Sequence, residues 1–340
     1  MAGKHNYNAM ATFKIYKLHF NTPLHIGDKR DDEGVSLKTI QSDTLMAAIT
    51  SALAKVGNKI PDNGDLGCVV SSLFPYYQGE KDTSSATYFL PMPLSSRPPV
   101  LADVSKAKMV KRIRWIDAQL YGKVLAGENL FDGSVEHFDN IHGEFLTTSV
   151  LPDKFIRSEV CQRVKLESRV GETDALPYYV DRITFEHRSG LYFIVKGDTT
   201  LLDRGLHILM QEGIGTDRST GYGFFEVQTD ELKLNTPLEA KYVVSLSLLI
   251  PADKNQLNGL FSGEEIAYDF LRRGGWITTQ PYQQLRKNAI YGFLPGSVFS
   301  KQENDVCGTI VDLAPAIVKA SSEAHPIWRD GRSILLPIKR

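Results

Sequence analysis

Two stretches of the chain show strong hydrophobic patterning, and the first lies near the N-terminus. Residues 12–20 mix aromatic and β-branched side chains with interleaved Lys and His, which predicts a strand. Apolar residues then recur at helical spacing from Leu45 to Val56, and Gly57 marks the end of the predicted helix. The tripeptide Ser42-Asp43-Thr44 precedes that run, so we expect it to cap the helix N-terminus.

The second patterned stretch repeats this order later in the chain. Strands are predicted at residues 178–185 and 190–196, joined by a short turn. Apolar residues on one side of residues 202–210 predict a helix that ends at Gly213. A glycine-rich loop then leads into a strand at residues 224–227. A strand and helix followed by strand, helix and strand is the order of a split βαβ, ferredoxin-like domain.

The rest of the chain completes the prediction of an α+β protein. Residues 60–99 are rich in Pro, Gly and Ser and are interpreted as irregular, and residues 129–176 as an insertion that carries a long hairpin. Asn235-Thr236-Pro237 marks a boundary. We therefore predict a disordered lead at 1–11, a domain at 12–235 with the insertion around 129–176, and a second α+β domain at 236–340.

Composition narrows the class of protein only slightly. The net charge of −1 argues mildly against a free-standing nucleic-acid binder, although local basic patches remain compatible with it. No apolar run approaches the length of a membrane span. The three cysteines lie far apart, without CxxC or His at zinc spacing, so we expect no disulfide, no metal, no cofactor and a cytoplasmic location.

The glycine-rich loop at residues 213–223 is the most informative element. Its glycines permit positive φ angles and close backbone approach, so its amides can line up against phosphates. It follows a helix and opens a strand, which is the wrong order for a Walker loop or a dinucleotide fold. Phosphate or RNA-backbone binding and a purely structural turn both stay open. The candidate binding residues are Gly213, Gly215, Thr216, Arg218, Ser219, Thr220 and Gly221.

Other candidates are a histidine and two basic stretches. His25 lies in the loop at residues 22–28, and a single loop histidine more often forms hydrogen bonds than acts as a catalyst. Arginine and aromatic side chains suit phosphates and stacked bases, although solvated charge is the plain alternative. The basic and aromatic candidates are Arg157, Arg163, Lys165 and Arg169 on the insertion, and Arg272, Arg273 and Trp276 in the second domain.

Several motifs in the same order carry a family resemblance. The segments at 22–28, 41–45 and 213–224 resemble those of the repeat-associated mysterious proteins (RAMPs) of CRISPR systems. Three later stretches narrow the resemblance to the fourth Csm subunit of type III-A complexes: Arg272-Arg273-Gly274-Gly275-Trp276, residues 294–299, and the ending at 325–328 with 336–338.

The resemblance implies two ferredoxin-like (RRM-type) domains with a thumb β-hairpin inserted in the first. It also implies a non-catalytic subunit that caps the 5′ handle of the crRNA and contacts the large polymerase-cyclase subunit and a backbone RAMP subunit. By this likeness the glycine-rich loop, with Ser42, Asp43 and Thr44, faces the phosphates of the handle. The thumb near residues 157–169 reaches the guide–target duplex.

Three alternatives remain beside this interpretation. A guide-processing endoribonuclease of the same superfamily would cut without metal and use His25. A neighbouring RAMP subunit would cap the 3′ end of the guide. A phosphate-binding metabolic enzyme has only the glycine-rich loop in its favour.

Overall fold

The computed structural model describes residues 8–27, 35–79, 86–95, 104–131, 135–152, 154–169, 172–322 and 324–340. The helices are α1 Ser42–Lys55, α2 Val104–Arg112, α3 Ala118–Leu125, α4 Thr200–Glu212, α5 Lys254–Leu260 and α6 Ala316–Lys319, with 3₁₀ turns η1 Val135–Asn140 and η2 Arg218–Thr220. The strands of the first two-thirds are β1 Asn8–Phe20, β2 Cys68–Val70, β3 Phe74–Gln78, β4 Ala86–Pro91, β5 Trp115–Asp117, β6 Ile141–His142, β7 Phe145–Leu146, β8 Ile156–Arg169, β9 Glu172–Phe185, β10 Ser189–Gly197 and β11 Phe225–Pro237. The remaining strands are β12 Tyr242–Ser245, β13 Phe270–Arg273, β14 Ile290–Phe293, β15 Val298–Ser300, β16 Val306–Cys307, β17 Ile310–Asp312, β18 Trp328–Asp330 and β19 Ser333–Ile338.

A nine-stranded sheet in the order β11-β1-β10-β3-β4-β5-β7-β6 forms the centre of the molecule, and β2 also pairs with β10. Strand β1 pairs antiparallel with β11 along its whole length and with β10 in its second half. Its buried side chains alternate: Tyr16, Leu18 and Phe20 join one core cluster, whereas Phe13 and Ile15 join another. Both faces of the sheet are therefore covered by other elements.

Helices α1 and α4 lie together on the face of this sheet that carries Tyr16, Leu18 and Phe20. They approach closely because Gly205 lacks a side chain: a Cβ there would lie 2.5 Å from Cγ2 of Ile49. Helix α4 ends at Gly213, as predicted, and the amide of that residue donates to the carbonyl of Leu209 at 2.8 Å. The glycine-rich loop therefore leaves the helix at a fixed point.

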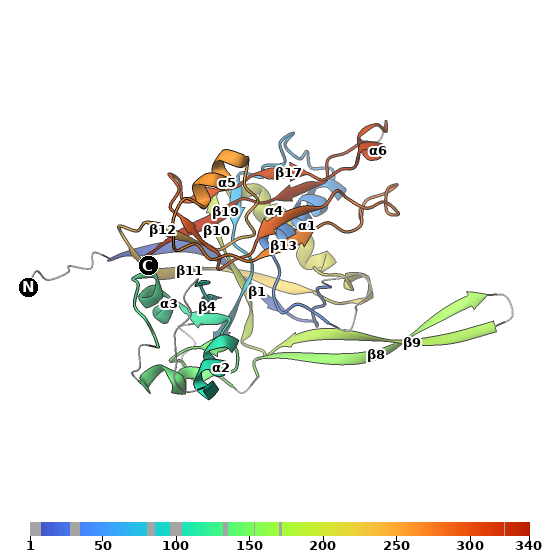
Figure 1. Cartoon of the computed structure of the whole chain (residues 1–340). Coiled ribbons are helices and arrows are strands. Elements are labelled where there is room, and N and C mark those ends of the chain that lie inside the picture. Colours follow the sequence, from blue (N-terminus) through green and yellow to red (C-terminus); the bar gives the residue numbers. More distant parts are fainter. Residues whose placement is uncertain are drawn as a thin grey trace, which may run out of the picture.

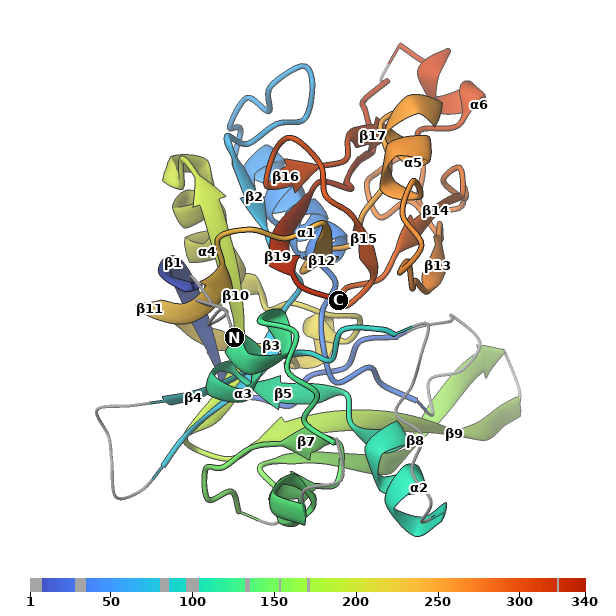
Figure 2. The ribbon, with the colours of Figure 1, turned by 60° about the vertical axis from the view of Figure 1, so that its left-hand side comes forward.

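The opposite face shares its core with the C-terminal part of the chain. Leu246 and Leu336, from the segment around the sheet β15-β12-β19-β16, belong to the same buried cluster as Phe13 and Ile15 of β1. In Figures 1 and 2 the C-terminal elements, in orange and red, fill the upper part of the view, and α2 lies in its lower part. Leu120 and Leu125 of α3 belong to the same buried cluster as Leu246 and Leu336. Strand β11 runs through the predicted boundary to Pro237, and the division into domains at 235/236 stays a prediction.

Strands β8 and β9 form a long antiparallel hairpin that projects away from the body (Figure 1). Its root is fixed by two hydrogen bonds between the backbones of Leu24 and Ile183, each 2.8 Å. The hairpin strands end at residue 185, not within the insertion predicted at 129–176. The strand predicted at residues 178–185 is part of β9 and pairs with β8. The strand predicted at residues 190–196 is β10, which pairs with β1 and β3.

Other differences from the sequence prediction concern short buried strands and element ends. Residues 60–99, interpreted as irregular, contain β2, β3 and β4. Strand β1 begins at Asn8 instead of residue 12, and residues 1–7 of the predicted lead lie outside the described residues. The ferredoxin-like assignment of the two halves stays a prediction. Within the described ranges, no helix is both long and apolar enough to cross a membrane.

The N-terminus of α1 is joined to the C-terminal part by a buried ion-pair network. The cap position is Gln41, which makes no side-chain capping bond, so the predicted role of Ser42-Asp43-Thr44 as the cap is wrong. Asp43 is fully buried, and its carboxylate accepts from Arg273 of β13 at 2.7 and 3.1 Å. Arg329 of β18 adds a bond of 3.1 Å to the same carboxylate. Three distant segments therefore meet at one carboxylate.

We predict that Asp43→Ala lowers the free energy of unfolding by about 3–5 kcal/mol, because it leaves the buried guanidinium of Arg329 and the partly buried one of Arg273 without their counter-charge. Urea unfolding followed by tryptophan fluorescence measures this change. The control is Asp253→Ala, which removes only the helix cap that accepts from Gln256 at the start of α5 and should cost about 1 kcal/mol. Equal losses for the two variants would contradict a central role for the network.

Candidate nucleic-acid interface

The glycine-rich loop is held against the loop that follows β1. The amide of Thr216 donates to the carbonyl of His25 at 3.0 Å, and the amide of Gly223 donates to that of Pro23 at 2.8 Å. The amide of Gly27 donates in return to Oγ1 of Thr216 at 3.3 Å. The two loops quoted for the family resemblance are thus one bonded unit.

Close backbone contact explains two of the glycines, and backbone conformation explains a third. A Cβ on Gly215, whose φ is +111°, would lie 2.5 Å from the carbonyl oxygen of His25. A Cβ on Gly223 would lie 1.8 Å from that of Ile214. Gly221 has a φ of +91° with open space around it, so only its conformation requires glycine.

His25 is a positioning residue in this structure. It is 2% exposed, and its Nδ1 lies 2.6 Å from the backbone oxygen of Asp181 on β9. Because a carbonyl oxygen only accepts, Nδ1 carries the proton and donates. The ring therefore ties the loop after β1 to the hairpin, and its burial removes it from the reach of a substrate.

The hairpin also contacts the glycine-rich loop through Arg163. Its guanidinium lies 2.9 Å from Oδ2 of Asp217 and 4.9 Å from the ring centroid of Tyr222. Burial opposes the charge of Arg163, but hydrogen bonds to Tyr222 and Tyr178 hold its pKa above the ordinary value. A hydrogen bond to Glu159, at 2.8 Å, likewise raises the pKa of Arg182 on β9. The hairpin thus presents two charged guanidinium groups beside the loop.

The tip of the glycine-rich loop offers groups that suit a phosphate. Arg218 is half-buried and, among the described residues, its side chain has no hydrogen-bond or ion-pair partner. Ser219 and Thr220 are exposed, although the Thr220 hydroxyl donates to the carbonyl of Asp217 at 2.9 Å. One open cation and two hydroxyls therefore lie on consecutive residues.

The remaining candidates on the hairpin differ in what they offer. Arg157 is exposed and ion-paired with Glu186. Lys165 and Arg169 lie in β8, but their side chains fall outside the described residues. Val160, Val164 and Tyr179 are each more than half exposed, so apolar side chains also face solvent on this arm.

In the structure the side chains of Ser42 and Asp43 are buried and make internal contacts. Ser42 is buried and its hydroxyl accepts from the amide of Leu248 at 3.0 Å, while Asp43 is enclosed by arginines. Thr44 is half-buried and its hydroxyl accepts from Arg273. The sequence predicted that these three side chains face the phosphates of the handle, but in the structure they make internal contacts. Local sequence patterns could not reveal this, because their partners lie about 200 residues or more away in the sequence.

The residues of the Arg272–Trp276 stretch likewise differ in whether they make internal contacts or face solvent. Arg273 serves Asp43, whereas Arg272 is exposed on β13. Trp276 is half-buried, and the guanidinium of Arg286 lies 4.9 Å from its ring centroid. The structure does not bring these residues together with the glycine-rich loop.

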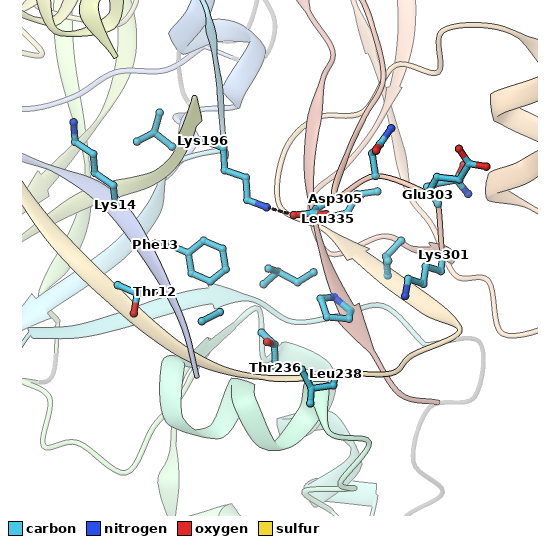
Figure 3. Close-up of a pocket in the computed structure, with 17 residues that line it drawn as sticks. Thr12, Phe13, Lys14, Lys196, Thr236, Leu238, Lys301, Glu303, Asp305 and Leu335 are labelled. Carbon is cyan, nitrogen blue, oxygen red and sulfur yellow. Dashed lines mark hydrogen bonds and ion pairs between the residues drawn. The ribbon is translucent and has the colours of Figure 1, made fainter. Parts of the chain in front are cut away.

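A cavity of about 470 Å³ lies elsewhere, between the start of β1, β10 and the segment 301–305. Figure 3 shows Phe13 in its lining and Lys196 reaching Asp305, at 2.8 Å. The glycine-rich loop instead meets the chain just after the end of β1. The cavity is therefore separate from the loop interface. Among the described residues, no group of three or more His, Cys, Asp or Glu side chains could hold a metal ion.

Sequence reasoning missed the residues that link these elements: Asp217, Tyr222, Asp181 and Arg182, together with Lys287 and Arg329 near Asp43. Tyr222 and Asp217 lie inside the glycine-rich loop. The available signal was the combination of an aromatic residue in this loop with arginines on the insertion, since a guanidinium can pack on an aromatic ring. The others have partners from distant segments, which no local pattern reveals.

Comparisons with known proteins agree over most of the chain. The family described as "CRISPR Csm4 C-terminal domain" matches residues 238–338. A protein of Mycobacterium tuberculosis (strain ATCC 25618 / H37Rv) named "CRISPR system Cms protein Csm4" is 25% identical over 339 residues, covering 96% of this chain and 97% of its own length. A protein of the same name from Thermococcus onnurineus (strain NA1) is 26% identical and covers 69% of this chain and 75% of its own.

Solved structures share the fold. The Csm3-Csm4 subcomplex of the type III-A CRISPR-Cas interference complex contains a chain with TM-score 0.62 and 17% identity, covering 96% of this chain and all of its own. A Csm1-Csm4 cassette in complex with cA4 gives TM-score 0.59 at 20% identity, covering 97% and 98%. The chain thus shares the fold of CRISPR-associated proteins of the RAMP type. Residues 238–338 match the family model of the Csm4 C-terminal domain, and the chain as a whole is similar to Csm4 proteins, in line with the resemblance of its motifs.

We predict that Gly215→Ala destabilises the protein more than Gly221→Ala. Both changes place a side chain at positive φ, which costs about 1–3 kcal/mol, but only the former also meets a backbone oxygen. Thermal unfolding of the two variants measures the difference. Equal melting temperatures would show that the contact between the two loops does not constrain Gly215.

Proposed function

We propose that this chain is a non-catalytic guide-RNA-binding subunit of a type III-A CRISPR effector complex, which grips the 5′ handle of the crRNA. The observation that carries the proposal is the bonded unit formed by the glycine-rich loop, the loop after β1 and the root of the β8–β9 hairpin. This unit is rigid at its base and presents Arg218, Ser219 and Thr220 at its tip.

The chemistry of this unit suits an RNA backbone better than a base sequence. Backbone amides, hydroxyls and a guanidinium hold phosphates in register without reading base edges. A 5′ handle that all guides share must be bound in one register, and a site that contacts the phosphate backbone can fix that register. We place Gly213, Gly215, Thr216, Arg218, Ser219, Thr220 and Gly221 along the handle.

The hairpin is proposed as the thumb that reaches the guide–target duplex. Its exposed Val160, Val164 and Tyr179 are apolar side chains of the kind that insert between stacked bases. Arg157 and Arg163 near its root would contact phosphates on either side. We also propose that the two halves of the chain are RRM-type units, since β11-β1-β10-β3 with α1 and α4 has the element order of a split βαβ fold.

The proposed protein partners follow from the relatives. Solved Csm4 chains occur in a Csm1-Csm4 cassette and in a Csm3-Csm4 subcomplex. We propose that this chain likewise joins a large polymerase-cyclase subunit to a backbone RAMP subunit. The alternative role, an endoribonuclease that uses His25, is disfavoured because that ring is buried and bonded to the hairpin.

Co-expression with the other subunits, pull-down on this chain and sequencing of the bound RNA test the proposal. We expect guide RNAs that share one 5′ handle, recovered together with a large polymerase-like subunit. Cleavage of repeat RNA by the purified chain, abolished in His25→Ala, would assign it to the nuclease class instead. Recovery of the other subunits without any guide RNA would also refute the proposed role.

We predict that Arg218→Ala weakens binding of a handle RNA by roughly fivefold near 0.1 M salt, because one phosphate contact contributes about 0.7 to the salt slope for single strands. Fluorescence anisotropy across a salt series should show a shallower slope for the variant. Lys254→Ala, at an exposed position at the start of α5, is the control and should leave both affinity and slope unchanged. An unchanged slope in Arg218→Ala would remove this residue from the interface.

We predict that Val164→Ser combined with Tyr179→Ser leaves guide retention unchanged but reduces distortion of the guide–target duplex. A fluorescent adenine analogue in the target strand, read in the assembled complex, reports local unstacking. Ser158→Ala, lower on the same hairpin, is the control. Full unstacking in the double variant would exclude these side chains as the wedge.

A further inference from the structure

The ion-pair network around Asp43 contains more positive than negative charge. We define the Asp43 cluster as Asp43, Arg273, Arg329 and Lys287. Arg273 and Arg329 share the one carboxylate, and the charges of both also act on Lys287. Three cationic groups against one carboxylate leave a surplus of two positive charges when Lys287 is protonated.

Two cationic donors in the cluster lack acceptors. Arg329 is 5% exposed, and its Nε is buried without a hydrogen-bond partner. Lys287 is half-buried, and among the described residues its ammonium has no hydrogen bond or ion pair. Burial, together with the charges of Arg329 and Arg273, lowers the pKa of Lys287 to about 8. Since buried polar groups in proteins are almost always bonded, these donors call for a partner beyond the protein, and the surplus of positive charge favours an anion over a water molecule.

The cluster is partly exposed to solvent at Arg273. The Arg273 side chain is 18% exposed, so its guanidinium is not sealed by protein. Gly275 has open space where a side chain would stand, and its carbonyl accepts from the amide of Lys287 at 2.9 Å. An anion therefore has an approach to the surplus charge.

We propose that the Asp43 cluster is a phosphate-binding site, with Lys287, Arg273 and Nε of Arg329 as the donors. A phosphate group fits because its oxygens accept from several directions and because its charge of up to −2 balances the surplus of two. The source of the phosphate is either the backbone of a bound RNA or a free phosphate or nucleotide. Binding of an RNA phosphate rests on the proposed function, whereas binding of free phosphate or a nucleotide does not.

Thermal unfolding of the full chain in phosphate-free buffer tests the site, with sodium phosphate as the probe and sodium chloride of equal ionic strength as the reference. We expect phosphate at about a hundredfold its Kd to raise the melting temperature by about 4 °C. Lys287→Met should raise the melting temperature without phosphate, because it removes an unpaired cation, and should abolish the rise with phosphate. Lys254→Met should keep that rise. Equal effects of phosphate and chloride, or a full rise in Lys287→Met, would overturn the proposal.

The pH dependence provides a second test that needs no variant. Phosphate binds the protonated ammonium, so its stabilising effect is present below the pKa of Lys287 and is lost as pH rises through and above it. The rise in melting temperature should therefore shrink as the pH rises from about 8 to about 9.5, although the fraction of phosphate present as the dianion does not fall over that range. A rise that is constant or grows over that range would also overturn the site.

Binding of single-stranded RNA separates the two sources. If RNA occupies the cluster, the RNA should abolish the further rise with phosphate, and Lys287→Met should weaken RNA binding in addition to any effect of Arg218→Ala. If the ligand is free phosphate, RNA affinity should be unchanged in Lys287→Met while the effect of phosphate is lost. Because Arg218 lies outside the cluster, Arg218→Ala should keep the phosphate effect, so failure of the proposed handle site is distinguishable from failure of this one.

Discussion

The arrangement of the molecule depends on one buried carboxylate. Asp43 begins the helix that covers the central sheet, and its charge is bonded by arginines from β13 and β18, which come from the last quarter of the chain. A buried charge is tolerated only when it is paired and hydrogen-bonded. The N-terminal helix and the C-terminal strands must therefore dock together, and the chain cannot place one without the other. The shared hydrophobic core on the far face of the sheet adds non-directional stability to this contact.

A second constraint fixes the site that we assign to RNA. Gly213 ends α4, Gly215 lets the glycine-rich loop lie against the backbone of His25, and Gly223 lets the same loop close on its own Ile214. His25 then ties the same unit to the hairpin through the carbonyl of Asp181. The loop tip is therefore held by groups that lie behind it. Such preorganisation lets a short segment hold a flexible strand without ordering itself on binding.

Local patterns in the sequence predicted much of the first half correctly and failed for identifiable reasons. The alternation in β1 and the helical spacing of α1 and α4 mark elements with one buried face, and those were found. Strands β2 and β3 are almost wholly buried, so they show no alternation, and they were taken for irregular chain. Ser42 and Asp43 looked like cap or phosphate contacts because their real partners lie more than 200 residues away.

The near-neutral net charge is compatible with RNA binding once the partners of the arginines are known. Arg157, Arg163 and Arg273 each have a carboxylate partner, so part of the charge of each is balanced within the chain. Among the described loop residues, Arg218 offers an unpaired cation. Binding by this surface would then depend on amides, hydroxyls and fit more than on long-range attraction. A subunit of this kind holds RNA well only when neighbouring subunits enclose the same strand, which is the setting of an effector complex.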